Sequence, residues 1–175
     1  MSMTKIATVT VGSGGAASID FTSIAGTFTD LMVVASLRAS VDANSSGAIL
    51  SVKPNGSTSS ITARTLNGTG SSADSGTETI WYGRTNPSDY TSSTFSNVSI
   101  YIPNYAGSTN KSVSIDGVAE NNATATKMVL SAGLWSNTTA ISSLNLVPGG
   151  GSWVQYSTAT LYGITKGSLA GVTVS

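Results

Sequence analysis

The sequence contains no histidine and no cysteine. Without histidine it lacks the usual general base, the commonest metal ligand and the base of the standard serine triad. Without cysteine it lacks thiolate catalysis, cysteine-bound zinc and disulfide bonds, so packing and association must supply its stability. We therefore expect a protein that is not an enzyme and that holds no cofactor or metal.

Charge is also scarce, at 9% of residues against about 25% in typical soluble domains, and eight basic residues balance eight acidic ones. This balance gives no electrostatic attraction toward nucleic acid or anionic lipid, so we expect neither as a partner. No apolar run reaches the roughly 20 residues of a membrane span, and the opening MSMTKIATVTV lacks the long apolar stretch of a secretory signal. We expect no membrane partner and a chain made in a cytoplasm.

The few carboxylates are poorly placed for catalysis. Asp116 and Glu120 lie four residues apart, which on a strand separates them by about 13 Å, too far for a paired-carboxylate site. We expect the acidic residues to sit on loops and edges for solubility.

Two short motifs imitate ligand sites. Asp42–Gly47 resembles the first half of a calcium-binding loop, but Lys53 stands at the twelfth position, where a bidentate Glu is needed, so an Asx-rich turn is expected. Gly12–Ala17 and Gly68–Ala73 match the dinucleotide pattern G-x-G-x-x-A. Neither opens a helix, so we interpret both as turns.

What the sequence does contain is a strand pattern. Hydrophobic residues make up 39% of the chain, and they alternate with hydroxyl residues in short runs bounded by Gly, Asn, Ser and Pro. We expect about eleven strands and a hairpin link near Asn104–Thr109. The expected strands are Lys5–Val11, Ala17–Phe21, Asp30–Arg38, Ala48–Lys53, Ser60–Leu66, Thr77–Gly83, Thr94–Pro103, Lys111–Ala119, Thr126–Trp135, Ile141–Val147 and Trp153–Ile164.

No stretch of a dozen residues has helical periodicity, and the length of 175 residues fits one domain spanning 1–175. Many strands of similar length predict an all-β protein, an antiparallel two-sheet β-sandwich of jelly-roll-like topology. The pattern leaves the strand order open.

The segment Asn97–Asp116 has an unusual polar face. Val98 and Ile100 alternate with Asn97, Ser99 and Tyr101, so one face is apolar and the other is polar without charge. Hydroxyl and amide groups cost less to desolvate than charges, so such a face suits contact with another protein, with copies of itself or with the hydroxyl groups of a glycan.

Aromatic residues cluster in the middle of the sequence near strand ends and turns, where a sugar could stack or a partner could bind. Each Trp in the chain has an alternative role as a cap on the end of the sandwich core. The candidate contact residues for an interface or a glycan are Trp81, Tyr82, Tyr90, Tyr101 and Tyr105.

Six segments carry a family resemblance, and together they span nearly the whole chain: SIDFTSI (18–24), TDLMVVASLR (29–38), NGSTSS (55–60), TFSNVSIYIPNYAGSTNKSVSIDGVAENN (94–122), AGLWSNTTAISSLNLVP (132–148) and VQYSTATLYGI (154–164). They resemble a group of small virion proteins of tailed bacteriophages, many from aquatic hosts. In that group similar modules occur both as free-standing virion proteins and as ends of longer tail-fibre chains. The resemblance carries no catalytic motif and implies a virion component made in the host cytoplasm.

These observations favour a capsid decoration, or cement, protein that binds the outer capsid surface as a homotrimer. Its partners would be the major capsid protein and its own copies, and it would stabilise the assembled head because it binds only the assembled state. The alternative is a tail-fibre or tail-associated module that recognises host glycan, with Trp81, Tyr82 and Tyr90 as stacking residues. A glycan depolymerase is least favoured because acid and base groups are so few.

Overall fold

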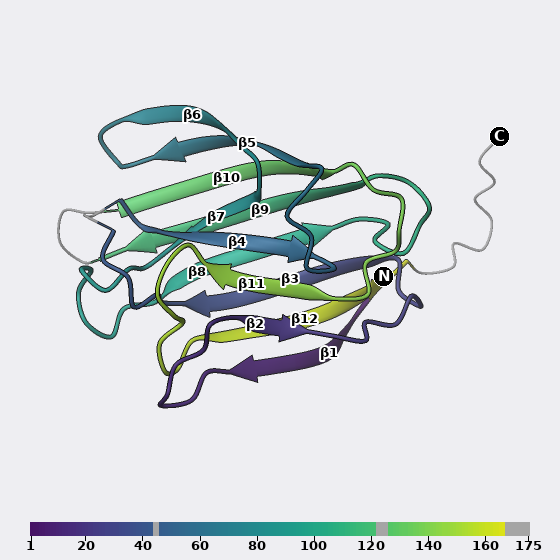
Figure 1. The fold of residues 1–175 in the computed structure, drawn as a ribbon, viewed down its shortest axis with the longest axis horizontal. Coiled ribbons are helices and arrows are strands. Elements are labelled where there is room, and N and C mark those ends of the chain that lie inside the picture. Colours follow the sequence, from purple (N-terminus) through teal and green to yellow (C-terminus); the bar gives the residue numbers. More distant parts are fainter. Residues whose placement is uncertain (44–45, 122–125, 167–175) are drawn as a thin grey trace.

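The structure is a computed structural model that describes residues 1–43, 46–121 and 126–166, and every regular element in these ranges is a β-strand (Figure 1). The strands form one eight-stranded and one four-stranded sheet, and every pair of neighbouring strands is antiparallel. This confirms the prediction of an all-β, antiparallel two-sheet sandwich. The jelly-roll topology stays a prediction.

The large sheet contains strands from both ends of the described chain. In spatial order its strands are β1 (Ser2–Thr10), β12 (Thr158–Thr165), β3 (Asp30–Leu37), β8 (Ser96–Ile102), β9 (Lys111–Glu120), β10 (Thr126–Trp135), β5 (Ile61–Gly68) and β6 (Ala73–Glu78). The last long strand, β12, therefore lies between the first strand and β3. Strand β6 is one edge of the sheet, and none of its residues is buried.

The small sheet covers one face of the large sheet. Its strands are, in spatial order, β2 (Ile19–Phe21), β11 (Leu144–Pro148), β4 (Ala48–Pro54) and β7 (Trp81–Thr85). Figure 1 shows this sheet in front of the large one, with the β5–β6 hairpin extending past it at the top.

The core between the sheets is formed by side chains that point alternately inward and outward along the strands. Strand β9 turns Val113 and Ile115 inward and Ser112 and Ser114 outward, because successive side chains of a strand point to opposite faces. Burial of such side chains contributes about 1.5–3 kcal/mol each. The turn between β8 and β9 falls at the predicted hairpin link, which is confirmed.

Two glycines allow β7 to approach the large sheet closely. A Cβ atom on Gly133 would lie 2.6 Å from Cδ1 of Trp81, and one on Gly117 would lie 3.0 Å from the carbonyl oxygen of Arg84. No other residue type leaves this space free. The strand with the bulky indole therefore packs directly on the parts of β9 and β10 that lack side chains.

The structure corrects one strand prediction in particular. Residues Thr77–Gly83 were expected to form a single strand, but the chain turns at Thr79 and Ile80, so β6 ends in the large sheet and β7 begins in the small one. The pattern of side chains does not change at this corner, which is why alternation alone does not reveal it.

Within the motif Asp42–Gly47, Asn44 and Ser45 lie outside the described residues.

Candidate interaction surface

The outer face of the large sheet, which points away from the small sheet, is nearly free of charge. Three rows of side chains cross all eight strands, and their charged members are Lys5, Arg64 and Asp116. From β1 to β6 the rows are Thr10, Thr158, Ser36, Asn97, Val118, Met128, Gly68, Ala73; then Thr8, Thr160, Val34, Ser99, Asp116, Leu130, Leu66, Ser75; then Lys5, Tyr162, Met32, Tyr101, Ser114, Ala132, Arg64, Thr77.

One half of this face is apolar. We call Leu66, Val118, Met128 and Leu130 the apolar patch; their side chains are 56%, 39%, 45% and 54% exposed. Register places Leu130 directly beside Leu66 and Met128 directly beside Val118, so the four side chains form a continuous surface over β5, β10 and β9. They line a shallow hollow. Contiguous exposed apolar surface of this kind marks a contact site in soluble proteins.

The apolar patch arises because β10 has apolar residues on both of its faces. Met128 and Leu130 point outward, whereas Ser131 and Gly133 point inward and are buried. Two other inward positions, Val129 and Trp135, carry buried apolar side chains, whereas Gly133 must lack one because the indole of Trp81 occupies the space beneath it. A shift of one residue would exchange the two faces, so the register commits Met128 and Leu130 to the surface and Val129 and Trp135 to the core.

Asp116 adjoins the apolar patch, directly opposite Leu130 in the register. Its side chain is exposed, and within the described ranges it has no hydrogen-bond or ion-pair partner. Its position in the middle of a sheet corrects the expectation that carboxylates sit on loops and edges.

Asp30 departs from that expectation as well, because it is buried at the start of β3. Its carboxylate receives hydrogen bonds from the hydroxyl of Tyr101 at 2.9 Å and from the backbone N–H of Asn104 at 3.0 Å. These bonds compensate for the loss of water around the carboxylate. The bond to Asp30 raises the pKa of Tyr101 above its usual value.

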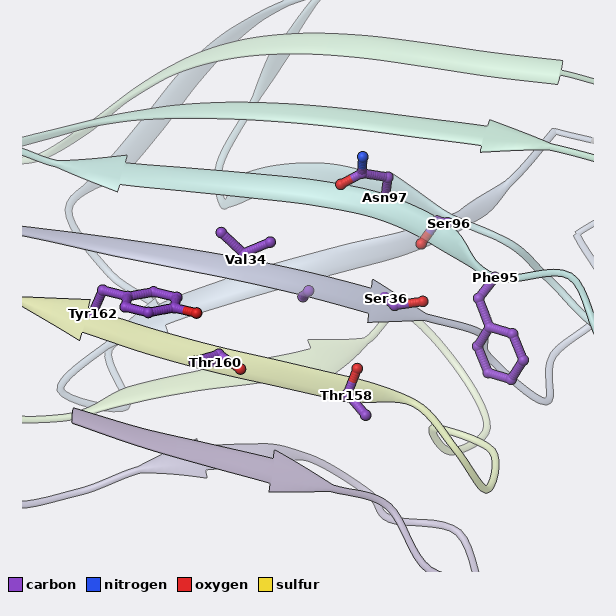
Figure 2. A pocket seen from close by; sticks show the side chains of 9 residues that line it. Val34, Ser36, Phe95, Ser96, Asn97, Thr158, Thr160 and Tyr162 are labelled. Atoms are coloured by element: carbon purple, nitrogen blue, oxygen red, sulfur yellow. The ribbon is translucent and has the colours of Figure 1, made fainter. Parts of the chain in front are cut away.

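The other half of the face contains a neutral hollow over β12, β3 and β8. Figure 2 shows Tyr162 and Phe95 at its two ends, with Ser36, Asn97 and Thr158 between them. Among the described residues that line it, none is charged. The side-chain polar atoms of Ser36, Asn97, Thr158 and Tyr162 have no hydrogen-bond partner within the described part of the chain.

Four of the five predicted contact residues lie in the interior, which corrects the sequence interpretation. Trp81 and Tyr105 are 0% exposed, Tyr82 is 4% exposed and Tyr90 is 3% exposed. A stacked sugar needs an accessible ring face, so these four side chains do not offer one. Tyr101, at 37% exposed, is the one that the structure places on the outer face. Burial raises the pKa of Tyr82, Tyr90 and Tyr105.

The tryptophans instead fill the core, and their role as caps on its ends stays a prediction. Trp135 and Trp153 are buried like Trp81, and the indole N–H of Trp153 donates to the carbonyl oxygen of Leu146 at 2.8 Å. Aromatic side chains supply the largest buried areas of any residue, which a chain without disulfides needs.

A buried cation fixes the loop that carries Phe95. The guanidinium of Arg38 donates five hydrogen bonds of 2.8 to 3.2 Å to this loop, and none of its acceptors is a carboxylate. The acceptors are the carbonyl oxygens of Ser88, Tyr90, Thr91 and Thr94 and the hydroxyl of Thr94. Burial lowers the pKa of Arg38, and the nearby charge of Asp89 opposes this effect. The loop between β7 and β8 is thus tied to β3.

The sequence interpretation missed the apolar patch, Phe95 and Tyr162. The segment KMVLSAGLW (127–135) has apolar residues at both odd and even positions, so the sequence predicts a strand without showing which face is outside; the small Ser131 and Gly133 are the available signal. Phe95 lies within residues 81–105 but is not among the predicted contact residues, and Tyr162 lies far beyond that range.

Comparison with protein-family models, with curated proteins and with solved structures found no match for this chain. In the described ranges, no group of three or more acidic side chains lies close enough together to hold a metal ion. The part of the chain that the structure describes also has no helix long and apolar enough to cross a membrane.

Proposed function

We propose that this protein is a structural component of a bacteriophage virion, a capsid decoration protein that binds the outer capsid surface and stabilises the assembled head. Its partners are the major capsid protein and two further copies of the chain in a homotrimer. The apolar patch on the outer face of the large sheet carries the proposal, and the family resemblance of the sequence supplies the kind of partner.

The chemistry of the face supports adhesion to another protein. Four apolar side chains with exposed fractions of 39% to 56% lie side by side, and the rows around them are mostly hydroxyl, amide and small residues, with Lys5, Arg64 and Asp116 as their charged members. Covering such a face with another uncharged surface gains hydrophobic free energy at about 25 cal/mol per Å² and removes few charges from water. A lattice of identical subunits offers that surface many times.

The proposed mechanism is thermodynamic. A subunit that binds across neighbouring capsid proteins, and not to free ones, stabilises the shell by mass action, and the effect grows with its concentration above the dissociation constant. The chain then needs a rigid, low-charge face and no reacting group.

The test is the copy number of this chain in purified particles of the phage that encodes it. We expect hundreds of copies per particle, comparable with the major capsid protein, and stripped heads that break at a lower temperature than decorated ones. A few copies per particle, or none, would overturn the proposal.

A matched pair of variants connects the result to the apolar patch. Leu130→Ser should abolish rebinding to stripped heads, whereas Val34→Ser, an exposed apolar residue at 44% on the other half of the same face, should rebind normally. Equal rebinding of the two variants would exclude the apolar patch as the contact surface.

A further inference from the structure

We propose that the neutral hollow between Phe95 and Tyr162 is a binding site for a neutral saccharide. The inference does not depend on capsid binding, because it uses strands β12, β3 and β8, whereas the apolar patch lies on β5, β9 and β10. It also relies on two accessible aromatic side chains, Phe95 and Tyr162, in place of the buried ones that the sequence suggested for glycan contact.

The composition of the hollow matches the chemistry of an uncharged sugar. A pyranose presents hydroxyl groups around its edge and C–H groups on its faces, so it needs amide or hydroxyl partners together with an apolar or aromatic surface. Ser36, Asn97 and Thr158 supply uncommitted polar groups, and Phe95 and Tyr162 supply half-buried rings. Figure 2 shows the polar side chains between the two rings.

The dimensions fit more than one sugar unit. Tyr162 and Thr158 are four residues apart on β12, which corresponds to about 13 Å along a strand. This is the length of a short oligosaccharide, and the hollow is open to solvent along the sheet, so a chain can lie across it.

The hollow is held in place before any ligand arrives. Arg38 ties the loop that ends at Phe95 to β3, and Asn86 adds a 2.9 Å hydrogen bond from its side-chain amide to the hydroxyl of Thr94. Thr158 and Ser36 lie opposite each other on paired strands. A site whose walls are already ordered loses less entropy on binding.

Backbone strain flanks the same end of the hollow. Ser93 has a backbone φ of 62° and Tyr156 has one of 71°, in the left-handed region that residues other than glycine rarely adopt. Each lies two residues before a residue that lines the hollow, Phe95 and Thr158. Tyr156 is 67% exposed, so its aromatic side chain lies in solvent.

The test measures binding of maltotriose, cellotriose, mannotriose and triacetylchitotriose to the full chain by saturation-transfer difference NMR and calorimetry. We expect binding of at least one of them, with weaker or no binding of a sialylated trisaccharide. Phe95→Ala and Tyr162→Ala should each weaken the affinity by about tenfold or more. Asn97→Ala, at an exposed position, tests the polar contacts with little effect on folding.

Leu130→Ser is the control, since it removes the apolar patch and leaves the hollow intact. It should bind the sugar normally and fail on capsids, whereas Tyr162→Ala should do the reverse, so the two proposals fail independently. The absence of any signal up to about 10 mM of all four neutral sugars, or binding that is unaffected by both aromatic variants, would overturn the saccharide site.

Discussion

The indole of Trp81 lies directly against Gly133, so closely that a Cβ atom at this glycine would be 2.6 Å from Cδ1 of the ring. Real Cβ atoms do not come this near to another atom, so the contact between β7 and β10 requires glycine. Gly133 lies on the inward face of β10 together with the buried Val129 and Trp135, and Leu130 lies on the opposite, outward face.

Gly133→Ala should lower the free energy of unfolding by about 1–3 kcal/mol, because the added methyl group forces Trp81 or Val113 from its position. Urea denaturation followed by tryptophan fluorescence measures the change. Gly12→Ala is the matched control, since a Cβ atom there meets nothing within 4 Å. Equal stability of the two variants would show that the close packing of Trp81 is not required.

Arg38→Met should destabilise the protein by at least about 2 kcal/mol, because it leaves the carbonyl oxygens of the loop between β7 and β8 without their donor. Hydrogen exchange of residues 86–95 should increase together with the loss of stability. Arg38→Lys keeps the charge but not the planar fork, so it should recover part of the loss. Arg64→Met, at an exposed arginine, should change the stability by no more than about 0.5 kcal/mol.

Ser131→Ala should leave the protein as stable or make it more stable. The hydroxyl of Ser131 is buried and has no hydrogen-bond partner among the residues that the structure describes, so its removal ends a desolvation cost. Ser96→Ala is the contrasting variant, because the hydroxyl of Ser96 donates to the carbonyl oxygen of Leu37 at 2.8 Å, and its loss should cost about 1 kcal/mol. A larger loss at Ser131 than at Ser96 would contradict this explanation.

Stability should fall as the pH rises above about 10. The pKa values of Tyr82, Tyr90, Tyr101 and Tyr105 are raised above the ordinary 10.0 in the folded protein. Between pH 10 and these raised pKa values, the folded state keeps phenol protons that the unfolded state releases. The stabilisation that is fully present below pH 10 is therefore lost as the pH rises through the raised pKa values. Burial lowers the pKa of Lys111, which acts in the opposite direction.

Urea midpoints measured from about pH 8 to 11, together with phenolate absorbance, test this dependence. The expected result is a decline in the midpoint that coincides with delayed ionisation of the buried tyrosines. A midpoint that stays constant or rises over this range would show that Lys111 or other groups outweigh the tyrosines.

Local pattern was sufficient for the class of fold but not for the location of the surface sites. In β9 the apolar Val113 and Ile115 alternate with serines and are also the buried residues, so alternation in the sequence identifies them correctly as core residues. Strand β10 has apolar residues on both faces, so the outward direction of Leu130 depends on which face packs against the other sheet, to which the sequence-distant Trp81 belongs. Trp81, Tyr82 and Tyr90 were assigned to a surface because their neighbours are turn residues, but the turns themselves fold over the core. The corner at Thr79 and Ile80 likewise depends on which sheet each strand joins.

The position of β12 between β1 and β3 has a consequence during synthesis. The neighbours that β12 joins emerge from the ribosome early, whereas β12 ends only at Thr165. Until that segment leaves the exit tunnel, the facing edges of β1 and β3 have no strand to pair with. Non-local pairing of this kind is slow. The nascent chain therefore completes its large sheet only after β12 has emerged, and the interval before closure is when chaperones matter most to its yield.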